Sequence, residues 1–388
     1  KNDTTRQLLH GSTILEVPAS GGSGNSSNWN STQIFDINND IDCLGDMYLE
    51  VEIDTNAGGS DITIFKAQQI ATAINRIEFQ VGTQIWQTLE YQDIMGLAST
   101  EMSEGTYREF SNQTSGRYTN TGKAMNKGAY TASAGFTDTN PSPADSARIA
   151  YIPLKMFTKS IGPELQHFSE KSEGGYLMAA APNQQVKIKV FTSAMFTPVA
   201  GGASDLNIRL FAKNIVMCNE EREQMKAMPM GIPKRIKTTQ NANTNIAAHA
   251  TAQVQLIDID HFSLYASHLL ITFPKTNYDD VLNVELLLNS SSFSGELPVS
   301  LLEIISSSMN LYNNNYIVNG EDADRFDTIV FPLASRAYSG SSVPLNRFDN
   351  IRLKIRHRVA VPSGPFNITC VGETTALYKG GAASLAMY

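Results

Sequence analysis

The sequence has few of the residues that build disulfide frameworks. Its three cysteines, Cys43, Cys218 and Cys370, lie far apart among 388 residues and form no CxxC pair. Such an odd, widely spaced set excludes a disulfide scaffold and is typical of a protein kept in a reducing compartment. Long apolar runs are missing too, since the longest, such as Tyr176 to Ala181, fall well short of the roughly 18 residues that a membrane span requires. We therefore expect no membrane-spanning helix.

The motifs of several large enzyme classes are also missing. The chain has no P-loop, no GxGxxG after a strand, no HExxH and no GxSxG nucleophile elbow. Its six histidines are scattered, and only His261 and His268 lie near each other, at a spacing that would place them on opposite faces of one continuous strand. We therefore predict no catalytic residue, no cofactor and no metal centre, and hence no enzyme activity.

Charged residues are sparse and mostly negative. They make up 18% of the chain, the formal net charge is −8, and the sequence pI is about 5.3. This balance opposes the positive field on which non-specific phosphate binding depends, so direct nucleic-acid contact is not expected. The apolar share of 41% is that of a globular protein, and the length suits two domains better than one.

Two groups of carboxylates were candidates for a cation site. The first group alternates along the chain and consists of Asp36, Asn38, Asp40 and Asp42. An EF-hand would need glycine where Ile41 stands and a bidentate glutamate where Met47 stands, so that interpretation fails. A looser calcium site between subunits or a solvated polar edge remain the alternatives. Asp258 and Asp260 would share one face of a strand, where we expect them to face solvent.

Many short windows alternate apolar with polar residues, the period of two that predicts half-buried strands. The clearest windows are Met47 to Ile53, Arg76 to Val81, Val186 to Val190, Val254 to Ile259 and Ile351 to Ile355. Segments between strands, such as Ala19 to Ser31, are rich in Gly, Ser, Asn and Thr, which favour turns and loops. Convincing amphipathic helices are few and short. The sequence therefore predicts an all-β chain of the sandwich or jelly-roll type.

One segment has the features of a linker. Asn219 to Pro233 follows a strand-like window, and within it Asn219 can cap a short helical run that Pro229 and Pro233 then end. We interpret this segment as the connection between two β domains of similar size. The predicted domains are residues 1–218 and 234–388, joined by a linker at 219–233.

The most suggestive charge pattern is a basic strip near the end of the chain. It consists of Arg352, Lys354, Arg356 and Arg358, which alternate with apolar residues and His357. In a strand all four cations would leave one face at a spacing of about 7 Å, which is comparable to the spacing of phosphates along a nucleic acid. The alternative, which we favour, is the polar face of an amphipathic strand whose cations pair with carboxylates of this acidic chain.

Three separated stretches carry motifs that are weak signals one by one and more informative in combination. In the first, Asn75 to Leu97, a strand-like window enters a Gly-Thr-Gln-Ile-Trp turn and then an aromatic and acidic helix-like stretch. The second is Glu220 to Met225, inside the predicted linker. The third joins an Asn-Gly pair at 319–320 and an Arg-Phe pair at 325–326 to the stretch Leu345 to Ile355.

A fourth stretch, Thr375 to Tyr388, closes the chain with the letters TALYKGGAASLAMY. In this order the four stretches resemble the major capsid proteins of nucleocytoplasmic large DNA viruses. Two departures are plain: Thr83 replaces one glycine of the family's Gly-Gly-Gln-Ile turn, and Met225 stands where the family has Phe. The chain is also short for that family.

The resemblance implies a double jelly roll, which is two consecutive jelly-roll β-sandwiches with few short helices. It also implies a structural role, in which homotrimers with a pseudo-hexagonal outline tile an icosahedral capsid. The partners would be the chain itself, neighbouring capsomers, and minor capsid or penton proteins, with no small-molecule substrate. The expected location is the virion, after assembly in the host cytoplasm or nucleus. Loops such as Tyr118 to Ser146 would face outward, and strand edges and terminal segments would contact neighbours.

Two other functions remain as alternatives. A minor capsid or assembly-scaffold protein would keep the fold and change the role. A carbohydrate-binding or hydrolytic β-sandwich would need aromatic side chains that line a cleft beside paired carboxylates, and Trp29 and Trp86 are the only tryptophans.

Overall fold

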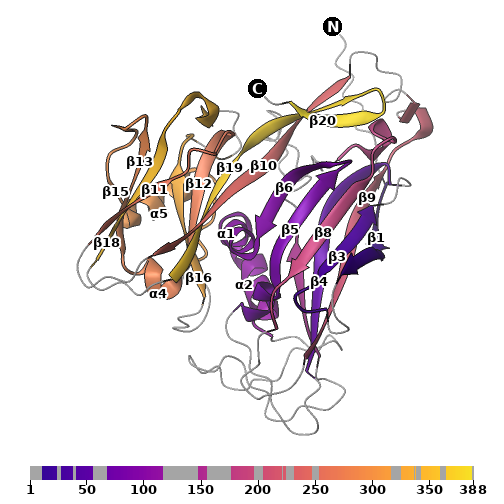
Figure 1. Cartoon of the computed structure of the whole chain (residues 1–388), viewed down its shortest axis with the longest axis horizontal. Helices are drawn as coiled ribbons and strands as arrows, with labels where there is room; N and C mark the ends of the chain where they lie inside the picture. Colours follow the sequence, from indigo (N-terminus) through magenta and orange to yellow (C-terminus); the bar gives the residue numbers. More distant parts are fainter. Residues whose placement is uncertain are drawn as a thin grey trace.

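The computed structural model arranges the chain as two β-sandwiches that lie side by side along its long axis (Figure 1). The residues it describes are 11–23, 28–37, 41–55, 68–116, 147–154, 176–195, 204–220, 222–223, 231–246, 253–315, 325–335, 337, 342–358 and 364–386. The loop predicted to face outward, Tyr118 to Ser146, lies outside the described residues.

The first sandwich consists of two antiparallel sheets. Sheet 1 has the strand order β1-β9-β4-β7, and sheet 2 has the order β2-β3-β8-β5-β6. Their bounds are β1 Gly11–Val17, β2 Ala19–Ser23, β3 Thr32–Ile37, β4 Cys43–Thr55, β5 Ile74–Val81, β6 Gln84–Glu90, β7 Ala147–Pro153, β8 Val186–Thr192 and β9 Ser204–Val216. Every second residue of β8 is buried, as the period of two requires. The strands predicted at 47–53, 76–81 and 186–190 are confirmed within β4, β5 and β8.

The second sandwich is built in the same way. Sheet 3 has the order β10-β19-β12-β16 with β17 and β20 attached, and sheet 4 has the order β11-β18-β13-β14 with β15 attached. Their bounds are β10 Ile232–Ile246, β11 Val254–Asp258, β12 Tyr265–Pro274, β13 Val281–Leu288, β14 Ser291–Ser292, β15 Leu297–Pro298, β16 Phe326–Pro332, β17 Val343–Pro344, β18 Ile351–His357, β19 Gly364–Lys379 and β20 Ala382–Ala386. The windows predicted at 254–259 and 351–355 correspond to β11 and β18.

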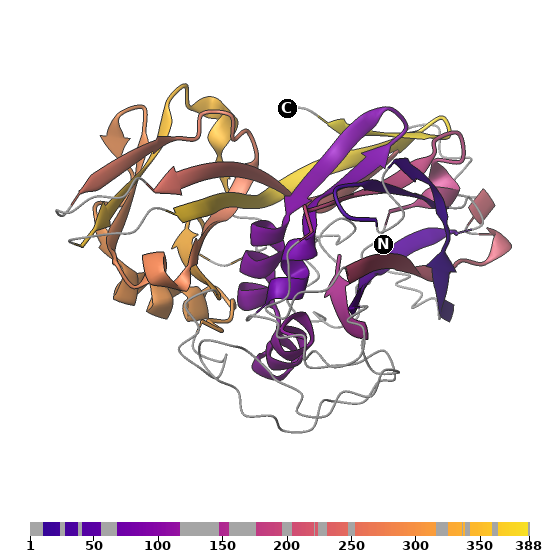
Figure 2. The same ribbon diagram turned by 60° about the horizontal axis from the view of Figure 1, so that its bottom comes forward.

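Helices are short, as predicted. Their bounds are η1 Gln69–Ala73, α1 Tyr91–Glu101, α2 Glu104–Thr114, η5 Met178–Ala180, α4 Lys275–Tyr278, α5 Val299–Ser308 and η6 Leu345–Arg347. Figure 2 shows α1 standing between the two sandwiches. In the described part of the chain no helix is long and apolar enough to cross a membrane.

The described residues form two hydrophobic cores, and sheet 3 contributes to both. Leu270 of β12 belongs to the first core, while its neighbours Leu269 and Ile271 belong to the second. Successive strand residues point to opposite faces, so both faces of sheet 3 are covered. This is why β12 is buried along nearly its whole length instead of alternating.

The chain ends in a hairpin that reaches from the second sandwich across the first (Figure 1). The second half of β19 pairs with β20 through a two-residue loop, because Lys379 lies opposite Ala382. Both loop residues, Gly380 and Gly381, have positive φ values of 63° and 78°. This backbone favours glycine and matches the twist of a tight hairpin, which explains the Gly-Gly pair in the sequence.

The segment between the two sandwiches departs from the prediction in one detail. Asn219 and Glu220 are helical, in agreement with a short helical run, and Pro229 lies outside the described residues. Pro233 does not end that run. It is the second residue of β10 and lies opposite Leu377 of β19, so sheet 3 begins inside the predicted linker.

Candidate functional site: the seam between the sandwiches

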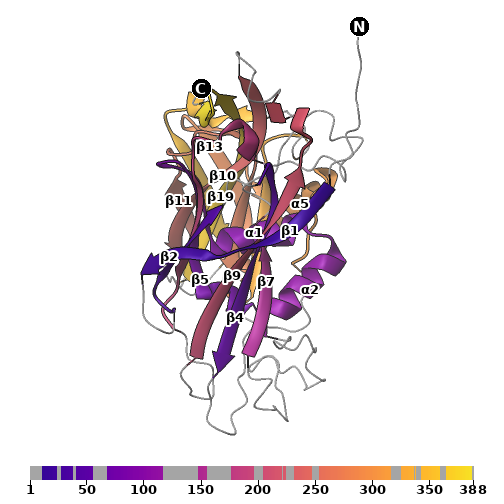
Figure 3. The same cartoon turned by 90° about the vertical axis from the view of Figure 1, so that its right-hand side faces the viewer.

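The richest set of buried polar contacts lies where the sandwiches meet. We call this zone the seam: the contacts of Gln68, β6, α1 and Tyr176 of the first sandwich with β10, β12, β16 and β19 of sheet 3. Figure 3 views the molecule along its long axis, with the strands of the two sandwiches stacked behind one another and α1 among them. A protein that acts as a rigid building unit depends on such a contact, because it fixes how the two halves are oriented.

A glycine lets α1 approach sheet 3 closely. A Cβ atom added to Gly96 would lie 2.5 Å from Oγ1 of Thr272 on β12, and 3.6 Å from Oγ1 of Thr328 on β16. A Cβ atom 2.5 Å from Oγ1 of Thr272 would overlap it, so either the helix or the threonine side chain would have to move. Glycine in the middle of a helix normally destabilises it relative to alanine, so its presence here is explained by close packing of helix against sheet.

Asp93 of α1 is the centre of a buried polar cluster that crosses the seam. Its Oδ1 accepts hydrogen bonds from Nδ2 of Asn367 and Oγ1 of Thr369, both on β19, at 2.5 Å each. Its Oδ2 accepts from Nδ2 of Asn241 on β10 at 2.9 Å and from the backbone N–H of Glu90 at 2.7 Å. The bond to Glu90 is half of a capping box that begins α1. One carboxylate therefore starts the helix and ties it to two strands of the other sandwich.

Four donors converge on this carboxylate, and no cation is among these four partners. Burial raises the pKa of Asp93 from 3.8 to about 6, and the hydrogen bonds from Thr369 and Glu90 oppose that rise. The ionised form suits the cluster geometrically because it offers only acceptors. The four hydrogen bonds offset only part of the cost of desolvating this carboxylate, so its pKa stays raised.

A buried ion pair lies at the other end of α1. Nζ of Lys237 on β10 contacts Oε1 of Glu101, the last residue of the helix, and the Lys237 side chain is fully buried. His268 of β12 is also fully buried nearby, and burial followed by the charge of Lys237 lowers its pKa to about 3. Its imidazole is therefore neutral at physiological pH, with Nδ1 2.8 Å from Oγ of Ser267.

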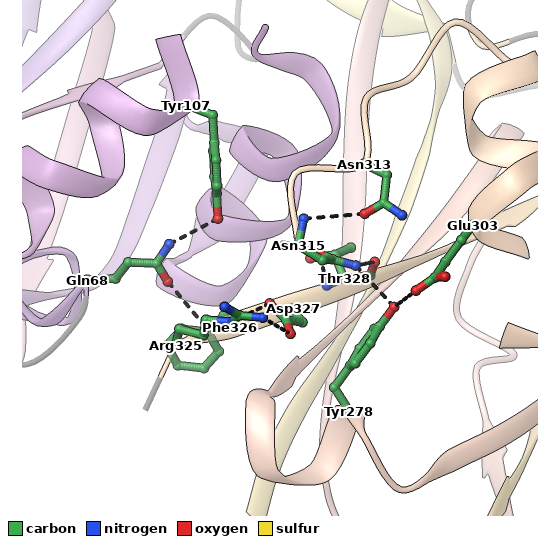
Figure 4. A network of polar contacts seen from close by, with 10 residues as sticks. All are labelled: Gln68, Tyr107, Tyr278, Glu303, Asn313, Asn315, Arg325, Phe326, Asp327 and Thr328. Carbon is green, nitrogen blue, oxygen red and sulfur yellow. Dashed lines mark hydrogen bonds and ion pairs between the residues drawn. The ribbon is translucent and has the colours of Figure 1, made fainter. Parts of the chain in front are cut away.

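Gln68 connects the first sandwich to the start of β16, as Figure 4 shows. Its Nε2 donates to the hydroxyl of Tyr107 on α2 at 3.0 Å, and its Oε1 accepts from the backbone N–H of Phe326 at 3.2 Å. Burial raises the pKa of Tyr107 to about 12, so this phenol keeps its proton. Beside them Arg325 and Asp327 form a buried two-point ion pair at 3.1 Å. Side chains thus fix the point where β16 enters the seam.

The same figure shows how Asn315 fixes the middle of β16. Its amide exchanges two 2.9 Å hydrogen bonds with the backbone of Thr328, in the manner of a neighbouring strand. Its Nδ2 also donates to the hydroxyl of Tyr278, which in turn donates to Glu303 of α5 at 2.5 Å. α5 is therefore tied to β16 by a continuous polar chain.

Aromatic rings hold the terminal hairpin on the first sandwich. The ring of Tyr378 on β19 lies 5.4 Å from that of Tyr176, which lies 5.4 Å from Trp86 and 6.0 Å from Phe79. All three pairs have edge-to-face geometry, which favours aromatic contacts. The Tyr378 hydroxyl also accepts a hydrogen bond from the backbone N–H of Leu177 at 3.3 Å. Burial raises the pKa of Tyr176 and of Tyr378, so both stay neutral.

The basic strip lies outside the seam, on the outer face of sheet 4. Three of its members project from alternate positions of β18, and each contacts a carboxylate; these contacts are Arg352 with Asp258 at 2.7 Å, Lys354 with Glu285 at 2.8 Å and Glu296 at 2.7 Å, and Arg356 with Glu296 at 2.8 Å. Hydrogen bonds from Arg356 and then Lys354 lower the pKa of Glu296 to about 2. Arg358 follows the strand and donates its backbone N–H to Asp280. Three of the four cations on this face thus lie beside carboxylates.

The structure separates the other candidate sites. His261 lies in the turn before β12 and bonds the backbone oxygen of Asn241, so it does not share a strand with His268 as supposed. Asp260 also lies in that turn and caps the backbone N–H of Ile351. Asp258 ends β11, so the two aspartates do not share a strand face either.

The alternating carboxylates near the start of the chain are only partly described. Asn38 and Asp40 lie outside the described residues. Asp42 is buried and bonds Nη2 of Arg222, and Asp36 lies 3.5 Å from Nζ of Lys187. Within the described residues no group of His, Cys, Asp and Glu is arranged to hold a metal ion.

Comparison with solved structures shows similarity over the whole chain. VP54 of the virus PBCV-1, from a crystal structure fitted into a cryo-EM reconstruction of the virophage Sputnik, has a TM-score of 0.72 at 12% identity, and 99% of each chain is covered. The PBCV-1 virus capsid gives 0.70 at 13% identity, over 100% of this chain and 99% of that one. The Faustovirus major capsid protein gives 0.64 at 9% identity, over 96% and 92%. This chain has their fold, a double jelly roll. No protein-family model and no curated protein matches the sequence.

Three of the four stretches that carried the family resemblance, the first, third and fourth, meet at the seam of this double jelly roll, whereas Arg222 of the second stretch bonds Asp42 in the first sandwich. Trp86 of the first stretch packs against Tyr176, which in turn packs against Tyr378 of the fourth stretch. Tyr91 of the first stretch contacts Phe326 of the third directly, with their ring centroids 5.6 Å apart. The departure at position 83 also has a physical reason. Gly82 has a φ of 59°, whereas Thr83 has no positive φ, so only the first turn position favours glycine.

Proposed function

We propose that this chain is a structural capsid protein that self-associates into trimeric, pseudo-hexagonal capsomers of an icosahedral virus shell. The observation that carries the proposal is the match of both sandwiches, in one arrangement and over nearly the entire chain, to a virus capsid and a major capsid protein. Structural similarity at a sequence identity of 13% or less supports the fold alone. The proposed role therefore rests on the fold together with the seam.

The seam supports a building-unit role. A capsomer tiles a shell only if its subunits keep a fixed shape, and here buried hydrogen bonds, an ion pair and an aromatic cluster join the two halves. Flexible domain pairs usually meet through smaller, more polar surfaces that allow relative motion. In this chain one hydrophobic core includes Leu270, Val330 and Val371 of the second sandwich together with buried residues from both sheets of the first sandwich. The two jelly rolls therefore act as one body.

We infer that the protein is not an enzyme and that its partners are copies of itself, neighbouring capsomers, and minor capsid or penton proteins. The virion would be its location, after assembly in the host cell. A sugar-binding role has little support, because Trp29 and Trp86 are both buried and neither ring is open to a ligand. We also infer that the two jelly rolls divide near residues 219–233, as the sequence predicts, and that the basic strip is structural and does not bind the genome.

Electron microscopy of the purified protein, alone and in particles from the source virus, tests the proposal. We expect pseudo-hexagonal trimers, and we expect this chain to be the most abundant protein of the shell. A low copy number per particle would favour the minor capsid alternative. Absence of the chain from particles would contradict both roles.

A further inference from the structure

The second sandwich has an open cleft on the side where its two sheets end in β10 and β11. β10 is an edge strand of sheet 3, and β11 is an edge strand of sheet 4. Residues 241–244 of β10, residues 255–258 of β11 and His261 line a largely polar cleft of about 600 Å³. We call this cleft the mouth. Its size falls within the range of ligand-binding clefts in proteins.

β11 presents backbone hydrogen-bonding groups to the mouth. In the described part of the chain β11 pairs with β18 alone, through a ladder without a bulge. Ile259, directly after β11, donates its N–H to the carbonyl of Ile351, so the odd-numbered residues of this segment face β18. The direction of these groups alternates along an antiparallel strand. The N–H and C=O groups that point toward the free edge therefore belong to Val254, Leu256 and Asp258.

β10 faces the mouth with an edge of the same kind. The carbonyl of Asn241 lies 3.0 Å from Nε2 of His261, and the carbonyl of Asn245 accepts from Nε2 of Gln255 at 3.1 Å. Both side chains stand where the N–H groups of a neighbouring strand would stand. The carbonyl of Asn243, halfway between these two carbonyls, points to the same edge because the direction repeats every second residue. The edge of β10 therefore accepts hydrogen bonds from the side of the mouth.

The edge of β11 lacks the usual protection against an added strand. Its sequence, VQLID, contains no lysine and no proline. Val254 and Leu256 are 42% and 55% exposed, and they lie on the outer face of sheet 4 because Ile257 between them points into the core. The cations opposite them on β18, Arg356 and Lys354, already pair with Glu296. A further strand beside β11 would cover both apolar side chains.

The dimensions of the mouth suit one extended strand. Packed sheets lie about 10 Å apart, and paired strands lie about 4.8 Å apart. A strand between the edges of β10 and β11 is therefore about one strand spacing from each of them. The edge of a folded second copy is two strands thick, so it does not enter the same gap. A single extended segment thus fits where a second copy does not.

We propose that the mouth binds an extended segment of another protein, which pairs with β11 and continues sheet 4. Apolar residues at alternate positions of this segment cover Val254 and Leu256 on the outer face. Small polar residues between them face the mouth, where the carbonyl of Asn243 accepts a hydrogen bond. Main-chain hydrogen bonds supply the affinity and the alternating side chains supply the specificity, as in other cases of strand addition. This site goes beyond the proposed function, because strand addition at the mouth needs no trimer.

Fluorescence anisotropy with a labelled peptide tests the site directly. The probe is KTVTVTVTK, which alternates valine with threonine and carries lysine near each end for solubility. We expect saturable binding to the purified full chain. The control peptide KTVPVPVTK replaces two threonines by proline, which removes two main-chain donors, and it should bind at least about tenfold more weakly.

Two substitutions at one position separate strand pairing from side-chain contact. Leu256→Pro removes an N–H that points to the mouth and not to β18, and edge strands tolerate proline at such a position. It should weaken binding of KTVTVTVTK by about tenfold or more. Leu256→Thr keeps the N–H and the β-branched shape of a strand residue, and it should bind within about threefold of wild type.

Hydrogen exchange of the unmodified chain gives a readout that needs no variant to fold. Addition of KTVTVTVTK should slow amide exchange at residues 254–258, and addition of KTVPVPVTK should not. Slower exchange elsewhere with no change at 254–258 would place the peptide at another site and contradict the proposal.

The remaining outcomes also decide the matter. Equal binding of the two peptides, or equal binding by folded Leu256→Pro and Leu256→Thr, would overturn strand pairing. No saturable binding up to about 1 mM peptide would overturn the site itself. Self-association that Leu256→Pro abolishes and Leu256→Thr retains would mean that a second copy covers β11, against the proposal. The mass of the chain in solution tests the capsid role separately, so failure of one leaves the other standing.

Discussion

The seam and the outer face of sheet 4 both carry paired charges, but in opposite surroundings. At the seam the side chain of Lys237 is fully buried and that of Glu101 is 8% exposed. On sheet 4 the side chains of Arg352 and Asp258 are 40% and 67% exposed. The partners are chemically alike, so the difference in their energetic importance comes from burial.

Access to water explains this difference in energetic importance. Removing one partner of a buried pair leaves an uncompensated charge without solvent, and this typically costs several kcal/mol. Removing one partner of an exposed pair lets water replace it, so little stability is lost. The seam should therefore be sensitive to single changes of charge and of volume, and the face of sheet 4 should tolerate them. The following predictions test this contrast.

The largest effect should come from Lys237→Met. It leaves Glu101 buried without its cation, and we expect the free energy of unfolding to fall by about 3–5 kcal/mol, measured by urea denaturation. Adding Glu101→Gln to the same chain removes the orphaned charge and should restore part of the loss. A single variant as stable as wild type would show that the pair is solvated in solution.

A pH-dependent effect should come from Asp93. Its folded pKa of about 6 lies above the ordinary value of 3.8, so the folded chain binds this proton more tightly than the unfolded chain. The resulting stabilisation is complete below pH 4 and is lost as the pH rises through 6. We expect wild type to gain up to about 3 kcal/mol of stability relative to Asp93→Asn as the pH falls from 7 to 4.

The matched control is Asp349→Asn, which removes an exposed carboxylate. Its stability difference from wild type should be small at every pH, and both series need only urea titrations. Wild type that loses stability relative to Asp93→Asn toward low pH would reverse the sign and contradict the assignment.

A smaller loss should follow Gly96→Ala, because the new methyl group would overlap Oγ1 of Thr272. We expect a loss of about 1–3 kcal/mol from overpacking, although alanine is the better helix former. Gly105→Ala in α2 is the control, since its Cβ would meet nothing within 4 Å, and it should leave stability equal or slightly higher. Adding Thr272→Ala should rescue Gly96→Ala. Two alanine variants of equal stability would mean that α1 is not tightly packed on sheet 3.

No resolvable change in the unfolding midpoint should follow Glu296→Gln. This carboxylate pairs with both Lys354 and Arg356, so its loss frees positive charge on the strip. We expect longer retention on a heparin column than for wild type. Asp349→Asn removes the same charge elsewhere and should give a smaller shift. Equal shifts would show that pairing with Glu296 does not neutralise the strip.

Local sequence patterns predicted the strands that have one face toward solvent. They missed the strands that are buried on both faces. β8 and β18 alternate strictly, so their period of two is visible in the sequence. β12 is covered by the second core on one face and by α1 on the other, so it has a nearly continuous buried run and no alternation. Its burial depends on the arrangement of the two sandwiches, which no short window contains.

The seam was the part that sequence reasoning missed. Asn367 and Thr369 lie more than 270 residues from Asp93, so no local spacing connects them. One signal was available: Glu90 and Asp93 stand at the spacing of a capping box directly after a strand. The basic strip was found because three of its four cations share one strand, but its partner Glu296 comes from the segment before β15 and could not be assigned from pattern.

The mass of the purified chain in solution tests the central claim most directly. Size-exclusion chromatography with light scattering over a wide concentration range should give a species of three times the 42.4 kDa chain mass, stable on dilution. A monomer that persists at the highest concentration would contradict the account of this chain as a self-assembling capsid subunit.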